Sequence, residues 1–200
     1  MNGVYNFIIK PKDSRYNNTK KIGDKNIILN TDIFQHQYVS REAIVISTPS
    51  ALKTDINTGD TIIVHHNIFR RYTDIKGVEQ DSKAYYKDNL YFAFIDQIFA
   101  YKKSDQFTGL GEWIPLDDYC FVKPIHSYEM FDVNKEQPLM GIMKHTNKNL
   151  PEVGSLVGFT PNSEYEFIID GERLYRVRTQ DISIKYEYQG KEKEYNPSWL

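Results

Sequence analysis

The sequence has only one cysteine in 200 residues, Cys120, so an intrachain disulfide cannot form. Cys120 stands in an apolar segment with no neighbouring histidine to lower its pKa, which favours core packing over a role as a nucleophile. No apolar run approaches the roughly 20 residues of a membrane-spanning helix, and the first residues lack the charged and apolar regions of a signal peptide. We therefore expect a soluble, cytoplasmic protein that does not bind a membrane.

The sequence is also poor in signs of catalysis and of nucleic-acid binding. The net charge is −2 and no block of basic residues is present, so the usual electrostatic signature of a nucleic-acid-binding protein is missing. No nucleophile elbow, phosphate loop or paired-glycine dinucleotide turn occurs. His65 and His66 form the most enzyme-like cluster, but adjacent residues on a strand point to opposite faces, which favours capping of hydrogen bonds over metal chelation. We predict a protein that is not an enzyme, with no metal site and no cofactor.

Long helical periodicity is missing as well, and what remains is typical of β-structure. Hydrophobic residues make up 40% of the chain, with fifteen Tyr and eleven Phe. The apolar runs are short and rich in β-branched residues, such as Ala43–Ile46 and Thr61–Val64, and turn residues bound them. Asp170-Gly171 lies between two apolar runs, which is a signal for a hairpin. The sequence therefore predicts an all-β fold.

Three segments in the first half of the chain have counterparts, in the same order, in the second half. The matched pairs are Phe7–Pro11 with Cys120–Pro124, Thr58–Val64 with Val153–Phe159, and Leu90–Ile98 with Leu174–Ile182. The intervals between matches are shorter in the second half, which indicates a duplicated domain that has lost loops. The alternative is that short β-rich stretches resemble one another by chance.

The repeats divide the chain into a first unit at 1–103, a glycine-containing linker at 104–112, a second unit at 113–190 and a tail at 191–200. The first unit contains a long polar segment at 13–41, and such loops in small domains are usually functional or disordered. This segment carries one apolar island, Ile27-Ile28-Leu29. The second unit has no comparable segment and no clear aliphatic triplet. The tail is either frayed or docked through Trp199.

The order of these segments resembles that of GroES-type co-chaperonins, and it is closer still to that of tandem co-chaperonin-like proteins of phages. The residues that carry the resemblance lie in short strands and turns across nearly the whole chain: Ile8–Lys10, Ile27–Phe34, Ala43–Ile46, Thr58–His66, Asp96–Tyr101 and Tyr165–Asp181. The resemblance implies two tandem GroES-like small β-barrels. It also implies a non-enzymatic protein that acts in the cytoplasm, or in the host cytoplasm if the source is viral.

In that family the loop after the first strand docks an aliphatic triplet on the chaperonin, a role that the resemblance assigns here to Ile27, Ile28 and Leu29. The implied partners are a GroEL-type chaperonin ring, further copies of the chain in a homo-oligomeric ring (a heptamer by analogy) and an enclosed folding client. Three readings stay open beside this one. Ile27–Leu29 could instead be a buried strand, the chain could be a viral structural or head-assembly protein that uses the barrel for oligomerisation, or it could be a single-strand nucleic-acid-binding barrel, which the charge disfavours.

Overall fold

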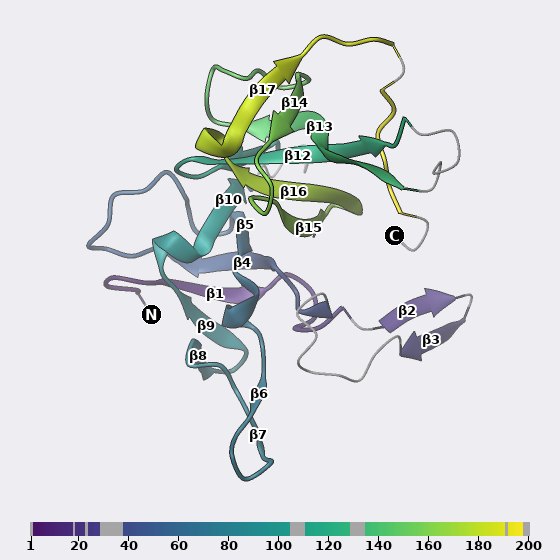
Figure 1. Ribbon diagram of the computed structural model, residues 1–200. Helices are drawn as coiled ribbons and strands as arrows, with labels where there is room; N and C mark the ends of the chain where they lie inside the picture. Colours follow the sequence, from purple (N-terminus) through teal and green to yellow (C-terminus); the bar gives the residue numbers. More distant parts are fainter. Residues whose placement is uncertain are drawn as a thin grey trace. The chain divides into compact units, whose positions relative to one another are not determined.

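The computed structural model describes residues 2–17, 19–22, 24–28, 38–104, 111–128, 135–190 and 192–197 (Figure 1). The chain divides into two compact units, Met1–Glu112 (unit 1) and Trp113–Leu200 (unit 2). Among the described residues the regular structure consists of strands and three short 3₁₀ turns. The prediction of an all-β fold is confirmed.

Unit 1 is built on a sheet in which six of its strands pair in the order β10-β5-β4-β1-β9-β8. Its elements among the described residues are β1 (Phe7–Pro11), β2 (Thr19–Ile22), β3 (Lys25–Ile28), β4 (Glu42–Ser47), β5 (Thr61–Val64), η2 (His66–Ile68), β6 (Tyr72–Thr73), β7 (Glu79–Gln80), β8 (Tyr85–Lys87), β9 (Leu90–Ala93), η3 (Ile95–Gln97) and β10 (Ile98–Lys102).

Unit 2 contains a six-stranded sheet with the order β15-β16-β12-β13-β14-β17. Its elements among the described residues are β11 (Trp113–Pro115), β12 (Tyr119–His126), β13 (Glu136–Thr146), β14 (Leu156–Phe159), β15 (Tyr165–Ile169), β16 (Glu172–Arg178), η4 (Thr179–Asp181) and β17 (Ile182–Tyr186). In the part of the chain that the structure describes, no pairing joins β15 to β17 or β8 to β10. Hydrogen bonds therefore do not close either sheet into a barrel, and the expected pair of tandem barrels is not confirmed.

The two units share one strand order, with β1, β4, β5, β8, β9 and β10 of unit 1 matching β12, β13, β14, β15, β16 and β17 of unit 2. The registers agree as well. Lys10 lies opposite Ile44 as Lys123 lies opposite Ile142, and both strand pairs carry an irregularity just before this point. The sequence matches that indicate a duplication therefore fall on equivalent strands.

The same tight turn precedes the third strand of each sheet. Gly59 (φ 93°) and Gly154 (φ 87°) occupy the left-handed region, where a residue with a side chain is strained. Each glycine N–H donates a hydrogen bond to the second strand of its sheet in chain order. Gly59 donates to the Val45 carbonyl in β4 (2.8 Å), and Gly154 donates to the Met143 carbonyl in β13 (2.7 Å). This turn explains why Thr58-Gly59-Asp60 and Val153-Gly154-Ser155 match in the sequence.

Each core follows from the alternation of apolar residues along the strands. In β4, Ala43 and Val45 are buried while Ile44 and Ile46 are only partly covered. In unit 2 the buried side chains of one cluster come from β12, β13, β14 and β16: Cys120, Val122, Met143, Val157, Phe159, Tyr175 and Val177. At roughly 1.5–3 kcal/mol for each fully buried aliphatic or aromatic side chain, burial of this kind is the main favourable term for folding.

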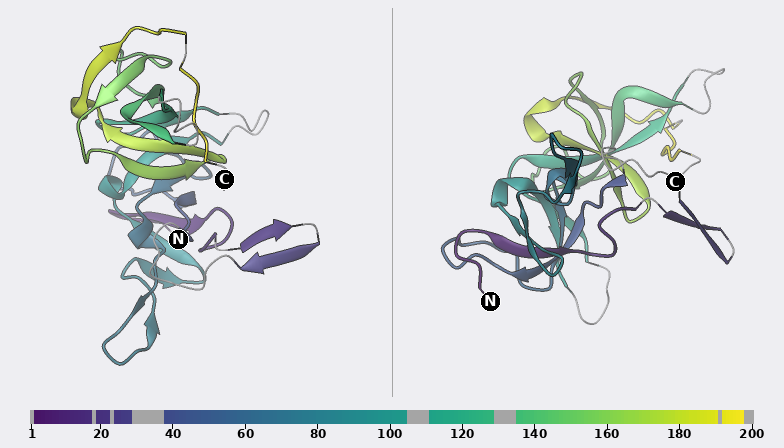
Figure 2. Two further views of the ribbon diagram at one scale, coloured as in Figure 1. Left: turned by 45° about the vertical axis from the view of Figure 1, so that its right-hand side comes forward. Right: turned by 90° about the horizontal axis from the view of Figure 1, so that it is seen from below.

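Unit 1 differs from unit 2 by two inserted hairpins. Where the structure describes the chain, β2 and β3 pair only with each other between β1 and β4, and β6 and β7 pair only with each other between β5 and β8. Figures 1 and 2 show both hairpins standing clear of the main sheet of unit 1. The duplicated core is therefore common to both units, and the additions belong to unit 1.

The tail is docked on unit 2 as far as the structure describes it. The Tyr195 N–H donates to the Pro124 carbonyl (2.8 Å), and the His126 N–H donates to the Lys193 carbonyl (2.9 Å). Trp199, which could have anchored the tail, lies outside the described residues, as does most of the expected linker at 104–112.

Candidate functional site

The candidate site is the β2–β3 hairpin, called the arm below, with the residues that join it to the sheet. Backbone hydrogen bonds close its base: Asn17 N–H donates to the Tyr38 carbonyl (2.7 Å) and Ser40 N–H to the Arg15 carbonyl (3.0 Å). Tyr16 and Val39 form a bridge between them. The two ends of the insertion are therefore held together, and the arm leaves unit 1 from one fixed point.

Within the arm, Thr19 lies opposite Ile28 and Lys20 lies opposite Ile27. The Ile27 side chain is 46% exposed and the Ile28 side chain 62% exposed. Both isoleucines are thus in a strand, but the strand is not a buried one, because a hairpin that pairs only with itself has no core to cover either face. Leu29, the third member of the expected triplet, lies outside the described residues.

Two residues that the sequence did not single out tie the base of the arm to unit 1. Arg15 forms an ion pair with Asp81, and its Nε donates to the Phe69 carbonyl. The Tyr16 hydroxyl accepts a hydrogen bond from the Arg71 N–H (2.7 Å). An arginine and a tyrosine near the start of the long polar segment were the available signal, but nothing in the sequence placed Asp81 or Arg71 beside them.

Among its described residues, unit 2 has no equivalent of the arm. Residues 127–135 connect β12 to β13, where unit 1 has residues 12–41 between β1 and β4. The Ser127 N–H donates to the Lys135 carbonyl (2.9 Å), which closes the connection directly. Any function of the arm therefore belongs to unit 1 alone.

The histidine pair has a local structural role. The His65 Nδ1 accepts a hydrogen bond from the Asn67 N–H (3.2 Å) and caps η2, as expected for a pair at a strand end. The rings of His65 and His66 stack with centroids 4.4 Å apart, so the expectation of opposite faces is wrong. The reason is that β5 ends at Val64, and the strand alternation ends with it.

The remaining candidates for chemistry are buried or dispersed. Cys120 is fully buried, as expected for core packing, and burial raises the pKa of its thiol to about 12, so the reactive thiolate is not formed at neutral pH. No group of three or more His, Cys, Asp or Glu side chains that could hold a metal ion occurs among the described residues. In the described ranges, no helix has the length and apolar character to cross a membrane.

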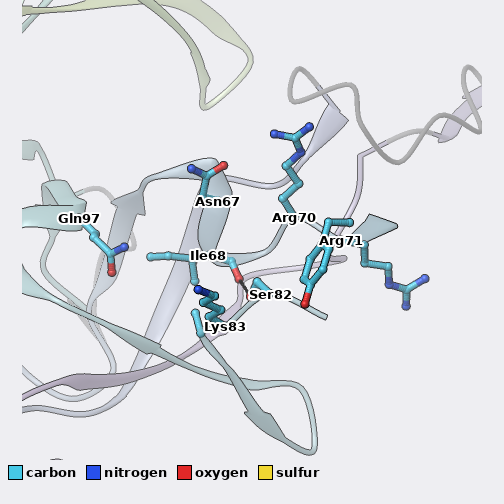
Figure 3. A pocket seen from close by; sticks show the side chains of 9 residues that line it. Asn67, Ile68, Arg70, Arg71, Ser82, Lys83 and Gln97 are labelled. Atoms are coloured by element: carbon cyan, nitrogen blue, oxygen red, sulfur yellow. Dashed lines mark hydrogen bonds between the residues drawn. The ribbon is translucent and has the colours of Figure 1, made fainter. Parts of the chain in front are cut away.

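The sequence also missed a pocket in unit 1, at the base of the β6–β7 hairpin. It has a volume of about 510 Å³ and is lined by residues of η2, of the segments on either side of the hairpin, of β6 and of η3: Asn67, Ile68, Arg70, Arg71, Tyr72, Ser82, Lys83, Ala84 and Gln97 (Figure 3). The available signal was the Arg70-Arg71 pair. Two adjacent arginines alone do not indicate a binding site, and Lys83, the third cation of the pocket, is distant in the sequence.

Comparison with known protein families matched no family model, and comparison with curated proteins found no relative. The resemblance to co-chaperonins therefore rests on the residues of this chain.

Proposed function

We propose that the chain is a co-chaperonin subunit that binds a chaperonin ring through the arm of unit 1. The observation that carries the proposal is the pair of exposed isoleucines, Ile27 and Ile28, on a hairpin held at its base and paired with no other strand. The shared strand order of the two units supports a further part of the proposal, that each unit corresponds to one small GroES-like barrel domain.

The energetics suit a partner that must be released. Ile27 and Ile28 are about half exposed, so their full burial adds roughly half of the 1.5–3 kcal/mol expected for each side chain. Leu29 contributes a third aliphatic side chain. One arm therefore binds weakly, and several arms on one homo-oligomeric ring bind together because the first contact raises the effective concentration of the others.

The arm is partly ordered before it binds. Ordering a flexible segment on a partner typically costs roughly 2–5 kcal/mol, and a hairpin whose strands already pair lowers that cost. In this proposal the client is enclosed by the ring assembly, and the nucleotide dependence belongs to the partner.

The test is capture of the purified protein by a GroEL-type chaperonin with nucleotide, comparing Ile28→Asp with Ile75→Asp. Ile75 is fully exposed on the β6–β7 hairpin, so it offers the same chemical change on the other insertion. Ile28→Asp should abolish capture, since an unpaired carboxylate would have to enter an apolar groove. Ile75→Asp should leave capture intact.

A third variant, Val157→Asp, sets the scale for misfolding, because Val157 is fully buried in β14. If Ile28→Asp lowers the melting temperature as much as Val157→Asp does, the isoleucine is part of the core and the docking role is wrong. Wild-type protein that is never captured, but is found in purified virions, would favour the viral assembly alternative.

A further inference from the structure

We propose that the pocket at the base of the β6–β7 hairpin binds a phosphate-bearing small molecule of nucleotide size. The proposal concerns a site separate from the arm and does not depend on the chaperonin. Arg70, Arg71 and Lys83 line the pocket, and among the described residues no carboxylate lines it. In Figure 3, Ile68 and Ser82 lie between Gln97 on one side and Arg71 on the other.

The local charge is positive in a chain whose net charge is negative. Two carboxylates lie close by: Asp81 pairs with Arg15 and lies 4.0 Å from Arg71, and Glu79 lies 3.4 Å from Arg71, so Arg71 already takes part in ion pairs. No ion pair is formed by Lys83 within the described residues. Among the described residues, the cluster at the pocket holds the cations Arg15, Arg70, Arg71 and Lys83 and the carboxylates Asp81 and Glu79, and this surplus of positive charge favours an anion.

The remaining lining groups suit a phosphate ester. The Gln97 Oε1 accepts a hydrogen bond from the Phe94 N–H (3.0 Å), which leaves the amide NH₂ as a donor toward a ligand. One guanidinium group can donate two parallel N–H hydrogen bonds to two oxygens of a phosphate. The Tyr72 ring is 44% exposed at the wall and offers a face for a planar group. The volume of about 510 Å³ lies within the range of roughly 300–1,000 Å³ typical of small-molecule sites.

The pocket is also a product of the insertion rather than of the duplicated core. Unit 2 connects β14 to β15 with residues 160–164 alone, and it has no counterpart of the β6–β7 hairpin. The core of this fold is therefore built without these cations. Arg70, Arg71 and Lys83 are additions to unit 1, as the arm is.

The test titrates the full-length protein at low salt with pyrophosphate, ADP and citrate, followed by calorimetry and by amide NMR shifts. We expect pyrophosphate and ADP to bind, with shifts centred on Asn67–Tyr72 and Ser82–Ala84. Lys83→Gln, and the double change Arg70→Gln with Lys83→Gln, should weaken binding by about tenfold or more, as expected when charge-assisted hydrogen bonds are lost.

The matched control is Lys76→Gln, which removes one exposed positive charge from the tip of the same hairpin, outside the pocket. Its affinity should stay within about twofold of wild type, since a screened surface charge contributes little. The proposal is overturned if neither phosphate compound binds the wild type, if Lys76→Gln weakens binding as much as Lys83→Gln, or if citrate binds as tightly as pyrophosphate.

Discussion

Asp60 is the residue on which the turn before β5 depends. Asp60 is only 2% exposed, but both of its carboxylate oxygens have partners. Oδ2 accepts a hydrogen bond from the Asn57 N–H (2.8 Å), Oδ1 accepts one from the Ser104 N–H (3.0 Å), and Lys103 Nζ lies 3.2 Å from Oδ2. The carboxylate thus joins the start of β5 to the residues that follow β10. A buried polar group is tolerated here because its partners come from both segments.

We predict that Asp60→Ala lowers the free energy of unfolding by about 2–3 kcal/mol, because two backbone N–H groups lose their acceptor and Lys103 loses its charge partner. Ser155 holds the equivalent place in unit 2, so Ser155→Ala is the matched control and should cost less, at most about 1 kcal/mol, because no charged group is removed. Denaturant unfolding of the variants measures both values. Equal losses would show that the turn does not need the carboxylate.

A second prediction concerns alkaline pH and Cys120. Burial raises the pKa of the folded thiol from 9.0 to about 12, so above about pH 9 the unfolded chain releases a proton that the folded chain keeps. Stability present below pH 9 is therefore lost as pH rises, at up to about 1.4 kcal/mol per pH unit. Cys120→Ala removes this dependence. Between about pH 9 and about pH 10.5 the wild type should lose roughly 2 kcal/mol more than the variant in urea unfolding; parallel curves would contradict the assignment.

At the scale of elements, the arm combines a closed base with a weak hairpin. The base is fixed by Arg15, Tyr16 and the bridge between Tyr16 and Val39. The hairpin itself is two short strands with no further partner, and such a hairpin is marginally stable in water. The arm should therefore open often while its point of attachment stays in place.

We expect limited proteolysis of the free protein to cut first within residues 13–41, since local opening exposes the backbone there. Lys20, Lys21 and Lys25 in the hairpin are trypsin sites. Bound chaperonin with nucleotide should protect the segment. First cleavage elsewhere, followed by an intact 13–41 fragment, would mean that the arm is more stable than its pairing indicates.

The sequence predicted the strands well where apolar runs are bounded by turns, as at Ala43–Ile46 and Thr61–Val64, because alternation and turn chemistry are local. It predicted a polar loop where the structure has the β2–β3 hairpin, since Lys, Asn and Thr give no clear β signal. The cations of the pocket could not be predicted, because Arg70 and Lys83 are distant in the sequence and line one pocket only in the folded chain.

At the scale of the whole molecule, the two units share one strand order, and within the described ranges the inserted hairpins belong to unit 1. The open edges of these sheets include β8 in unit 1 and β15 and β17 in unit 2. In β17 the side chains of Ile184 and Tyr186 remain exposed, at 49% and 37%. Exposed edge strands with apolar side chains favour association with another chain.

We predict that the protein forms a homo-oligomer at micromolar concentration, with a mass by light scattering that corresponds to a closed ring. Ile184→Lys should reduce the mass if the β17 edge takes part in the contact, because a charge on an edge strand opposes strand addition. Ile75→Lys, which places the same charge on the exposed β6–β7 hairpin, is the control. A monomeric wild type would remove the effect of multiple arms on which tight capture depends.

The closed base of the arm also has a consequence for how such a protein can change over generations. Because hydrogen bonds between Arg15–Asn17 and Tyr38–Ser40 close the base before the hairpin begins, the segment beyond them can vary in length and composition without disturbing the core. Sequence changes can therefore accumulate in this segment independently of changes in the two sheets. The same junction is a natural graft point, at which an arm from another protein could be exchanged to transfer its preference for a partner.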